Sequence, residues 1–282
     1  MIIDCNKIAN KIIDEIKGNL DAIKQNNVQP KIVILNSNNN KETQKFIEHK
    51  KKMAKNLGIQ CDVFSNFNNQ NNLIDCLKKI NNDSLIHGYI IQLPLKNGFK
   101  LNEIIEYIDI KKDIDGISQL SITRNFIRSN SFYNLPCTTE AILKIIENQK
   151  YKVSGKNVVV INRGLIIGKP LIANLLEMDA TVTICHSKTK NLSHFTNQAD
   201  LLITAIGKPN YLKKRMIKKN AFVIDAGISY INDKPFGDVD FDQVKNQAKY
   251  LTPVPNGVGK ITIAMIFKNL VNLIKNNIEM KK

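Results

Sequence analysis

Hydrophobic residues in the first half of the chain recur with two alternating periods. Apolar residues at helical spacing run through 8–23 and 43–57, and Gly58 closes the second of these amphipathic segments. Short apolar, β-branched runs of the kind found in buried strands lie between the helical segments. In chain order, the pattern predicts a helix at 8–23, a strand at 31–35, a helix at 43–57, a strand at 60–64, a helix at 73–80 and a strand at 85–92. Strands that alternate with helices indicate βαβ units and a parallel sheet.

The alternation lapses after Pro94, and we expect residues 109–135 to be irregular. A second series follows in the order helix 139–149, strand 157–161, helix 169–178, strands 181–185, 201–205 and 221–225, and a last helix at 261–278. We place the first domain boundary near Pro136, and the last helix can pack back on the first domain. The pattern as a whole predicts an α/β fold with two domains.

Composition agrees with a globular protein and adds a strong positive charge. The 282 residues include 41 Lys or Arg and 25 Asp or Glu, which gives a formal net charge of +16. Such a charge raises the possibility of a nucleic-acid partner. Aromatic residues are only 6% of the chain, however, and no nucleic-acid-binding motif is found. The basic residues also lie in Lys- and Asn-rich stretches throughout the chain, so we expect no single basic stripe and no nucleic-acid partner.

Other global features indicate a cytoplasmic protein without a membrane partner. No apolar run approaches the ~18 residues that span a bilayer, and the first ten residues do not resemble a signal peptide. The five cysteines are scattered singly, without a CxxC pair or a nearby histidine at ligand spacing. This spacing predicts neither a disulfide framework nor a metal site.

One turn has the composition of a phosphate-binding loop. After the strand at 157–161 comes Asn162-Arg-Gly164-Leu-Ile-Ile-Gly168, where backbone N–H groups and a helix N-terminus can meet a phosphate. The turn lacks a full GxGxxG pattern because Asn162 stands at the first glycine position, although Asn tolerates a positive φ. A plain turn between a strand and a helix is the alternative.

The end of the next strand indicates which nicotinamide cofactor would bind. An NAD-binding protein places Asp or Glu about 20 residues after the glycine turn, against the ribose hydroxyls. This chain has Cys185-His186-Ser187-Lys188 there and no acid. Together with Arg163, these donors suit a 2′-phosphate, which favours NADP over NAD.

Three features of the first half are further candidates. Phe46 and Lys50 are four residues apart on one predicted helix and so share a face. Gln92 ends a predicted strand, where α/β sheets bind ligands. Asp113 and Asp115 are close enough to suggest paired carboxylates, although a solvated loop would also explain both.

Taken together and in order, ten segments resemble the bifunctional methylenetetrahydrofolate dehydrogenase/cyclohydrolase (FolD) family. They cover nearly the whole chain, and QLPL, KDIDG, TVTICHS and TPVP are the specific ones. The segments are Thr43-Gln-Lys-Phe-Ile-Glu-His-Lys50, Gln92-Leu-Pro-Leu95, Lys112-Asp-Ile-Asp-Gly116, Pro136-Cys-Thr138, Gly155-Lys156, Asn162-Arg-Gly-Leu-Ile-Ile-Gly168, Thr181-Val-Thr-Ile-Cys-His-Ser187, Asp225-Ala-Gly227, Gly237-Asp-Val-Asp240 and Thr252-Pro-Val-Pro255.

The resemblance implies two α/β domains flanking a cleft, with a Rossmann-like NADP-binding domain at 136–259 and a catalytic, folate-binding domain at 1–135 and 260–282. It implies NADP-dependent oxidation of 5,10-methylenetetrahydrofolate to the 5,10-methenyl form, which water then opens to 10-formyltetrahydrofolate. A homodimer is also implied. The implied site residues, by role, are catalytic Lys50, Gln92 and Asp115, substrate-binding Phe46, Pro253, Val254 and Gly257, and cofactor-binding Asn162, Arg163, Gly164, Gly168, His186, Ser187 and Ile228.

Departures from the family pattern leave other functions open. Phe46 stands where the family has Tyr, so ring stacking can survive but the hydroxyl is lost. Further departures lie in ligand-binding loops, at Asn162, Gly164, Asn256, Lys260-Ile261, Thr139 and Ala141. The alternatives to a working bifunctional enzyme are a dehydrogenase whose cyclohydrolase is impaired by Phe46, a degenerate protein that binds folate or NADP, and a nucleic-acid binder driven by the positive charge.

Overall fold

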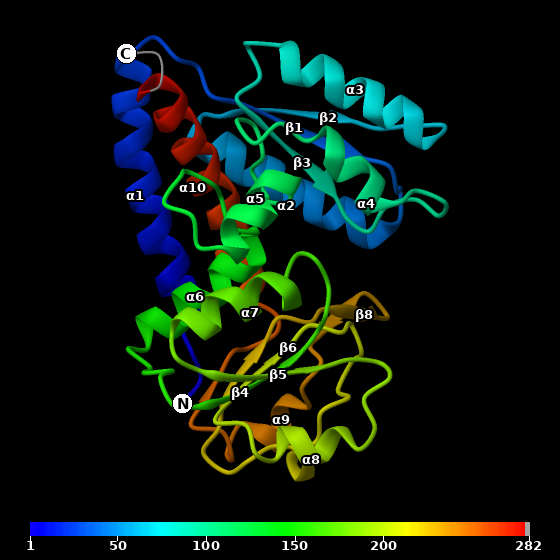
Figure 1. Cartoon of the computed structure of the whole chain (residues 1–282), viewed down its shortest axis with the longest axis vertical. Helices are drawn as coiled ribbons and strands as arrows, with labels where there is room; N and C mark the ends of the chain where they lie inside the picture. Colours follow the sequence, from blue (N-terminus) through cyan, green and yellow to red (C-terminus); the bar gives the residue numbers. More distant parts are fainter. Residues whose placement is uncertain (280–282) are drawn as a thin grey trace. The chain divides into compact units, whose positions relative to one another are not determined.

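The structure of the protein is a computed structural model that describes residues 1–279 (Figure 1). The chain divides into two compact units. The three-stranded unit comprises Ile12–Cys137 and the residues from Ile263 onward, and the five-stranded unit comprises Met1–Lys11 and Thr138–Thr262. Two long helices, α1 (Cys5–Gln25) and α10 (Val258–Glu279), contribute residues to both units.

The three-stranded unit is built on a parallel sheet in the order β2-β1-β3. It consists of β1 (Lys31–Asn36), β2 (Gln60–Phe64) and β3 (Gly88–Gln92). The chain passes from β1 to β2 through α2 (Lys41–Leu57) and from β2 across β1 to β3 through α3 (Gln70–Asn82). The two crossovers run in opposite directions, so α2 and α3 cover opposite faces of the sheet (Figure 1).

Helix α2 shows why the predicted helix at 43–57 forms. The side chain of Asn40 caps its first turn by accepting a hydrogen bond from the Thr43 N–H at 2.7 Å. Ile47, Ala54 and Leu57 share the buried face of the helix, which is the face that lies toward the sheet. The helix and strand predictions for residues 8–92 are confirmed, with β3 beginning at Gly88 rather than at residue 85.

The expectation of an irregular segment at 109–135 is wrong at α5 (Gln119–Phe126). Ser118 caps this helix through a 3.1 Å hydrogen bond from the Ser121 N–H. The helix is too short and too polar to show a hydrophobic period in the sequence. Two other short elements, α4 (Leu101–Ile104) and the 3₁₀ turn η1 (Ile105–Tyr107), were also not predicted.

The five-stranded unit holds a second parallel sheet, in the order β10-β7-β6-β4-β5. Figure 1 shows α7 (Gly168–Glu177) and α8 (Leu192–Thr196) on opposite sides of this sheet. The strands are β4 (Asn157–Ile161), β5 (Thr181–Cys185), β6 (Leu201–Thr204), β7 (Phe222–Asp225) and β10 (Tyr250–Leu251). The four predicted strands of this half are confirmed as β4, β5, β6 and β7, and the side chains of β4, β6 and β7 are mostly buried.

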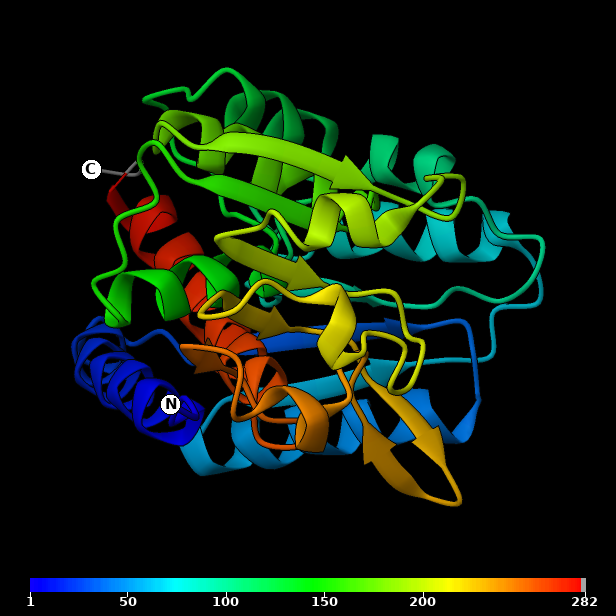
Figure 2. The ribbon, with the colours of Figure 1, turned by 90° about the horizontal axis from the view of Figure 1, so that it is seen from below.

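Shorter elements of the five-stranded unit had no signal in the sequence. In Figure 2, β8 and β9 form a separate antiparallel ladder, drawn in orange. Elements of two to five residues are shorter than the windows in which a period is visible. The elements not predicted are β8 (Ser229–Ile231), β9 (Lys234–Phe236), β10, α8, α9 (Phe241–Val244) and the 3₁₀ turn η2 (Lys214–Met216). The predicted helices at 139–149 and 261–278 are present as α6 (Cys137–Asn148) and α10.

The first residues of the chain pair with the five-stranded sheet. The Ile3 N–H donates to the Leu251 carbonyl at 2.9 Å, and the Leu251 N–H donates to the Met1 carbonyl at 3.0 Å. Through this pairing, residues 1–11 group by their contacts with the five-stranded unit. Among residues 1–279, no helix has both the length and the apolar character needed to cross a membrane.

A glycine in the three-stranded unit provides the first testable prediction. Gly116 has a φ of +60°, and a Cβ there would collide with the carbonyl of Asn134. We expect Gly116→Ala to lower the free energy of unfolding by about 3 kcal/mol or more. Gly98→Ala is the matched control, because Gly98 has a φ of +89° and open space around it, so its loss should be only ~1 kcal/mol. Denaturant titration of the three proteins would measure this, and equal losses in the two variants would contradict the steric explanation.

Candidate active site

Lys50 and Gln92 meet at the carboxyl edge of the three-stranded sheet. Gln92 is the last residue of β3 and lies beside Asn36, the last residue of β1. Lys50 projects from α2, and its Nζ donates a 2.7 Å hydrogen bond to Gln92 Oε1. The Gln92 amide nitrogen donates in turn to the Leu93 carbonyl at 2.7 Å, which turns the amide oxygen toward Lys50. The edge is the place where ligands bind in parallel sheets.

Burial gives Lys50 an unusual proton affinity. Its side chain is 8% exposed, and loss of hydration lowers the pKa of the Lys50 ammonium below its ordinary value of 10.5, while nearby Asp115 partly opposes this shift. Burial also raises the pKa of the Asp115 carboxyl, against the opposing effects of Lys50 and of hydrogen bonds from Cys137. The structure therefore brings together all three residues predicted to be catalytic.

Asp113 and Asp115 have different partners although they are two residues apart. The buried Asp113 carboxylate accepts hydrogen bonds from the Ile117 N–H at 3.1 Å, the Ser118 N–H at 2.7 Å and the Ser121 hydroxyl at 2.8 Å. These bonds make Asp113 an anchor for the start of α5, whereas Asp115 lies near Lys50. The suggestion of a pair of cooperating carboxylates is not supported.

Two buried asparagines hold the loop that carries Asp115. Asn134 Nδ2 donates to the Asp113 carbonyl at 3.0 Å, and Asn269 Nδ2 donates to the Ile114 carbonyl at 3.0 Å. Sequence reasoning missed both residues, because Asn is frequent in the loops of this chain. The only available signal was the position of Asn269 within the apolar face of the last helix, where a buried amide needs partners.

The residues predicted to bind substrate lie in both units. Phe46 is half-buried on α2, one turn before Lys50, as its spacing predicted. Pro253, Val254 and Gly257 lie in the loop between β10 and α10, within the five-stranded unit.

A second candidate centre follows β4 in the five-stranded sheet. In the sheet, β4 lies between β5 on one side and β6 on the other. The strand order therefore reverses at β4, and α/β sheets bind ligands at the carboxyl end of such a switch point. Asn162 is the first residue after β4, and its Oδ1 accepts hydrogen bonds from the Gly164 N–H at 2.7 Å and the Gly168 N–H at 3.1 Å. Its Nδ2 donates to the Ala205 carbonyl at 2.5 Å. Asn162 thus ties the turn to the end of β6.

The conformation of this turn requires a glycine at position 168 but no positive φ at Asn162. Asn162 is not among the residues with a positive φ, so the tolerance of Asn for that region is not used here. Gly168 begins α7, and a Cβ there would collide with the Asn162 carbonyl. Arg163 and Gly164 are exposed at the tip. The turn is therefore tightly packed at Gly168, and the Asn162 side chain supplies part of its internal hydrogen bonding.

The segment after β5 forms a compact turn without a carboxylate. The His186 N–H donates to the Thr189 hydroxyl at 2.9 Å, and the Lys188 N–H donates to His186 Nδ1 at 3.2 Å. Ser187 and Lys188 are exposed. This segment therefore offers hydrogen-bond donors and a positive charge but no carboxylate.

A buried pair of carboxylates, which sequence reasoning did not assign to the chemistry, holds the remaining loops of this edge. Asp225 accepts from the Gly227 N–H at 3.0 Å and the Val239 N–H at 2.8 Å. Asp238 accepts from the Thr204 hydroxyl at 2.8 Å and from the Ile206 and Lys208 N–H groups at 2.7 and 2.8 Å. Burial, and secondarily the charge of Asp238, raise the pKa of Asp225 to about 7. Ile228, predicted to bind the cofactor, follows the loop that Asp225 holds.

The raised pKa of Asp225 predicts how stability depends on pH. The folded protein keeps this proton up to about pH 7, whereas the unfolded chain releases it near its ordinary pKa of 3.8. Asp225 therefore makes the free energy of unfolding fall as pH rises through that window, by at most ~1.4 kcal/mol per pH unit. Asp225→Asn should remove this pH dependence, even if it also shifts the free energy of unfolding by the same amount at every pH. Asp242 is exposed on α9, and Asp242→Asn is the control that should keep the pH dependence. Unfolding titrations across the window would measure both, and an unchanged slope in Asp225→Asn would refute the assignment.

Two family models match most of the chain. The model described as "Tetrahydrofolate dehydrogenase/cyclohydrolase, catalytic domain" matches residues 3–115. The model described as "Tetrahydrofolate dehydrogenase/cyclohydrolase, NAD(P)-binding domain" matches residues 136–278. The first match contains Lys50, Gln92 and Asp115, and the second contains the turn after β4.

Curated relatives and solved structures are similar over nearly the full length. The "Bifunctional protein FolD" of Malacoplasma penetrans is 47% identical over 276 residues, which is 98% of both chains. A crystal structure of the FolD enzyme from Campylobacter jejuni has a TM-score of 0.92 at 34% identity and covers 98% of this chain and 99% of its own. The Trypanosoma brucei FolD, complexed with NADP cofactor and inhibitor, has a TM-score of 0.93 at 27% identity, with 99% of this chain and 98% of its own covered.

Proposed function

Because this chain belongs to the tetrahydrofolate dehydrogenase/cyclohydrolase family, we propose that its Lys50, Gln92 and Asp115 carry the chemistry of a bifunctional enzyme. The enzyme oxidises 5,10-methylenetetrahydrofolate to 5,10-methenyltetrahydrofolate with NADP and hydrolyses the product to 10-formyltetrahydrofolate. The observation that supports the site is the buried Lys50 Nζ, hydrogen-bonded to Gln92 Oε1 at 2.7 Å.

Lys50 is suited to the hydrolytic step because its proton affinity is reduced. When water adds to the methenyl carbon, a proton must leave the water, and another must reach the ring nitrogen as the bridge opens. A lysine whose pKa is lowered by burial releases its proton more readily than an ordinary lysine, and so exchanges protons with the substrate more readily. The hydrogen bond to Gln92 fixes the direction of Nζ during this exchange.

Asp115 and the half-buried ring of Phe46 are proposed to position the folate. The Asp115 carboxylate can accept two N–H bonds from the amino-pyrimidine edge of the pterin, a polar and geometrically specific contact. Phe46 offers an aromatic face one helical turn from Lys50. Pro253, Val254 and Gly257 are proposed to complete substrate binding from the loop after β10.

The five-stranded unit is proposed to hold NADP, which when bound accepts the hydride from the methylene carbon. Its fit rests on the donors after β5 and on the absence of a carboxylate there, which suits a 2′-phosphate near Arg163, His186 and Ser187. Gly164 and Gly168 have no side chain, and they are proposed to let the backbone of the turn after β4 approach the cofactor closely. Asn162 is proposed to act by holding this turn, since both of its side-chain groups are already bonded within the protein.

The organisation of the whole molecule is proposed on the same basis. We assign residues 1–135 and 260–282 to a catalytic domain and residues 136–259 to the NADP-binding domain. The two family models, at 3–115 and 136–278, support the boundary near Pro136. A homodimeric assembly and a cytoplasmic location rest on family membership alone.

Replacing Lys50 tests the catalytic assignment. Lys50→Met keeps a long side chain without the amine, and we expect methenyltetrahydrofolate hydrolysis to fall about 100-fold or more while NADPH still forms from 5,10-methylenetetrahydrofolate. Lys52→Met is the matched control, because Lys52 is exposed on the same helix, and it should leave both rates unchanged. NADPH formation and methenyl decay are followed separately on purified protein. Full hydrolysis by Lys50→Met would exclude Lys50 as the catalytic group, and NADP binding without turnover in the unaltered protein would favour a degenerate enzyme.

Restoring the hydroxyl at position 46 tests whether Phe46 limits hydrolysis. Because Lys50 is already oriented by Gln92, we expect Phe46→Tyr to change both rates by less than about threefold, which corresponds to under 1 kcal/mol. Phe46→Leu, which removes the aromatic face, should instead raise the KM for folate in both reactions. A tenfold gain in hydrolysis alone for Phe46→Tyr would favour a dehydrogenase whose cyclohydrolase is impaired.

A further inference from the structure

The fold gathers basic residues at one edge of the five-stranded unit. Residues 149–156, 213–220 and 245–250 contain ten Lys or Arg and no Asp or Glu, about a quarter of the 41 basic residues in less than a tenth of the chain. These segments lead into β4, β7 and β10. Because the strands are parallel, the three segments meet at the amino edge of the sheet. The other 31 basic residues are spread along the rest of the chain, as expected, but this edge concentrates about a quarter of the total.

Backbone hydrogen bonds fix these segments against one another. The Lys249 N–H donates to the Ala221 carbonyl at 2.9 Å, and the Asn220 N–H donates to the Gln247 carbonyl at 2.9 Å. The Asp200 N–H, at the start of β6, donates to the Asn157 carbonyl at 2.8 Å. The lysines thus project from a rigid frame rather than from free loops.

A hollow of about 500 Å³ opens in this edge, and we name it the lysine hollow. Its single acid, Asp200, accepts from Lys218 Nζ at 2.6 Å and from the Asn157 N–H at 3.0 Å. Six lysines line it, namely Lys150, Lys152, Lys156, Lys218, Lys219 and Lys249. Apart from Lys218, they form no ion pair with any residue in 1–279.

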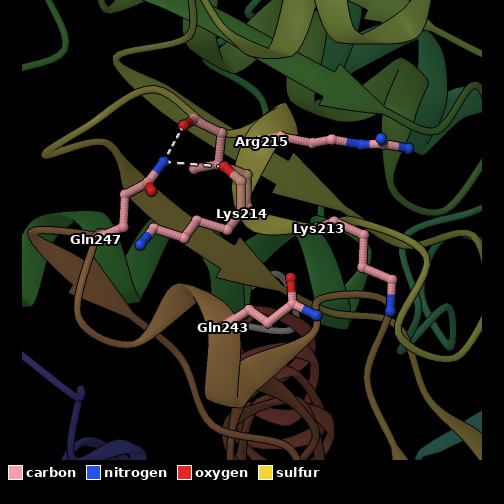
Figure 3. Close-up of a pocket in the computed structure, with 6 residues that line it drawn as sticks. Lys213, Lys214, Arg215, Gln243 and Gln247 are labelled. Atoms are coloured by element: carbon pink, nitrogen blue, oxygen red, sulfur yellow. Dashed lines mark hydrogen bonds between the residues drawn. The ribbon is translucent and has the colours of Figure 1, made fainter.

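A neighbouring hollow of about 630 Å³ is less suited to anions (Figure 3). There Lys213 Nζ lies 2.9 Å from an Asp240 carboxylate oxygen. The side chain of Gln247 donates to the Lys214 and Ile217 carbonyls. Figure 3 shows the Arg215 side chain extending away from Gln247. Its cations are fewer and diverge, so the lysine hollow is the stronger candidate.

We propose that the lysine hollow binds a short polyphosphate anion. Six ammonium groups around one acid repel each other and concentrate a positive field in a concave surface, which an anion with several charges neutralises. Lysine ammonium groups bind phosphate as point charges, and the volume lies in the range of small-molecule sites.

The aromatic residues of the lysine hollow favour a small anion over a nucleic acid. Binding of single strands depends on exposed rings that stack with bases. The Tyr151 ring packs edge-on against Phe222 with centroids 5.2 Å apart, and Tyr250 packs on the same ring at 5.1 Å. Lys249 Nζ lies over the Tyr250 ring at 5.5 Å. The rings are therefore occupied within the protein.

The lysine hollow is separate from the proposed cofactor site. It lies at the amino ends of the strands, whereas Asn162 and His186 follow their carboxyl ends. A five-residue strand spans about 15 Å. The two sites can therefore be filled at the same time, and the inference does not depend on the proposed function.

Calorimetric titration of tripolyphosphate into the full chain, saturated with NADP, tests the proposal. We expect binding that weakens steeply with salt. The combined variant Lys150→Gln, Lys152→Gln, Lys219→Gln and Lys249→Gln should lose about tenfold or more in affinity. The control combines Lys17→Gln, Lys24→Gln, Lys78→Gln and Lys79→Gln, which are exposed lysines of the three-stranded unit. It has the same net charge and should keep its affinity within about twofold.

Three results would overturn the proposal: no binding by the NADP-saturated protein, equal losses in the two variants, or a single-stranded oligonucleotide that binds here more tightly than tripolyphosphate. Melting temperature and NADPH formation check that both variants are folded. If the hollow variant fails to fold, acetylation of the unaltered protein replaces it. Tripolyphosphate should then protect Lys150, Lys219 and Lys249 but not Lys78, and uniform reactivity would refute the site.

Discussion

The burial of one ammonium group is the constraint on which the three-stranded unit depends. Lys50 lies almost out of contact with water, and only a correctly placed acceptor and a nearby carboxylate make this tolerable. Gln92 supplies the acceptor because β3 ends beside β1, and Asp115 supplies the carboxylate because its loop is held by Asn134 and Asn269. The sheet, the helix and the loop are thus each required by the same buried ammonium group.

In the five-stranded unit, a different constraint acts on the loops at the carboxyl edge of the parallel sheet. Its loops must present donors to an anionic cofactor while their own backbone groups stay bonded. Asp225 and Asp238 perform this task by accepting N–H groups from three separate loops. Negative charge therefore lies buried beneath a surface that offers positive charge, and the raised pKa of Asp225, about 7, limits what that burial costs.

The sequence predicted the long elements and the site residues that follow strands, and it missed what depends on tertiary contacts. Helices such as 43–57 and strands such as 157–161 have clear periods, whereas α5 and β10 are too short to show one. Lys50 and Gln92 could be paired only through motifs, because 42 residues separate them. Nothing in the local sequence distinguished Asn134 from the many asparagines in loops. The lysines of the lysine hollow come from segments that are far apart in the sequence, and only the order of the parallel strands brings them to one sheet edge.

Under the proposed assignment of the turn after β4 to the cofactor, the side chain of Asn162 changes the thermodynamics of binding more than its geometry. A glycine at this position would leave the turn free to sample several conformations, and binding would have to order it. Here the amide already holds Gly164, Gly168 and Ala205 in place. The entropy of ordering is thus lost during folding rather than during association. Asn at a position where the family has Gly is thus explained by preorganisation of the turn.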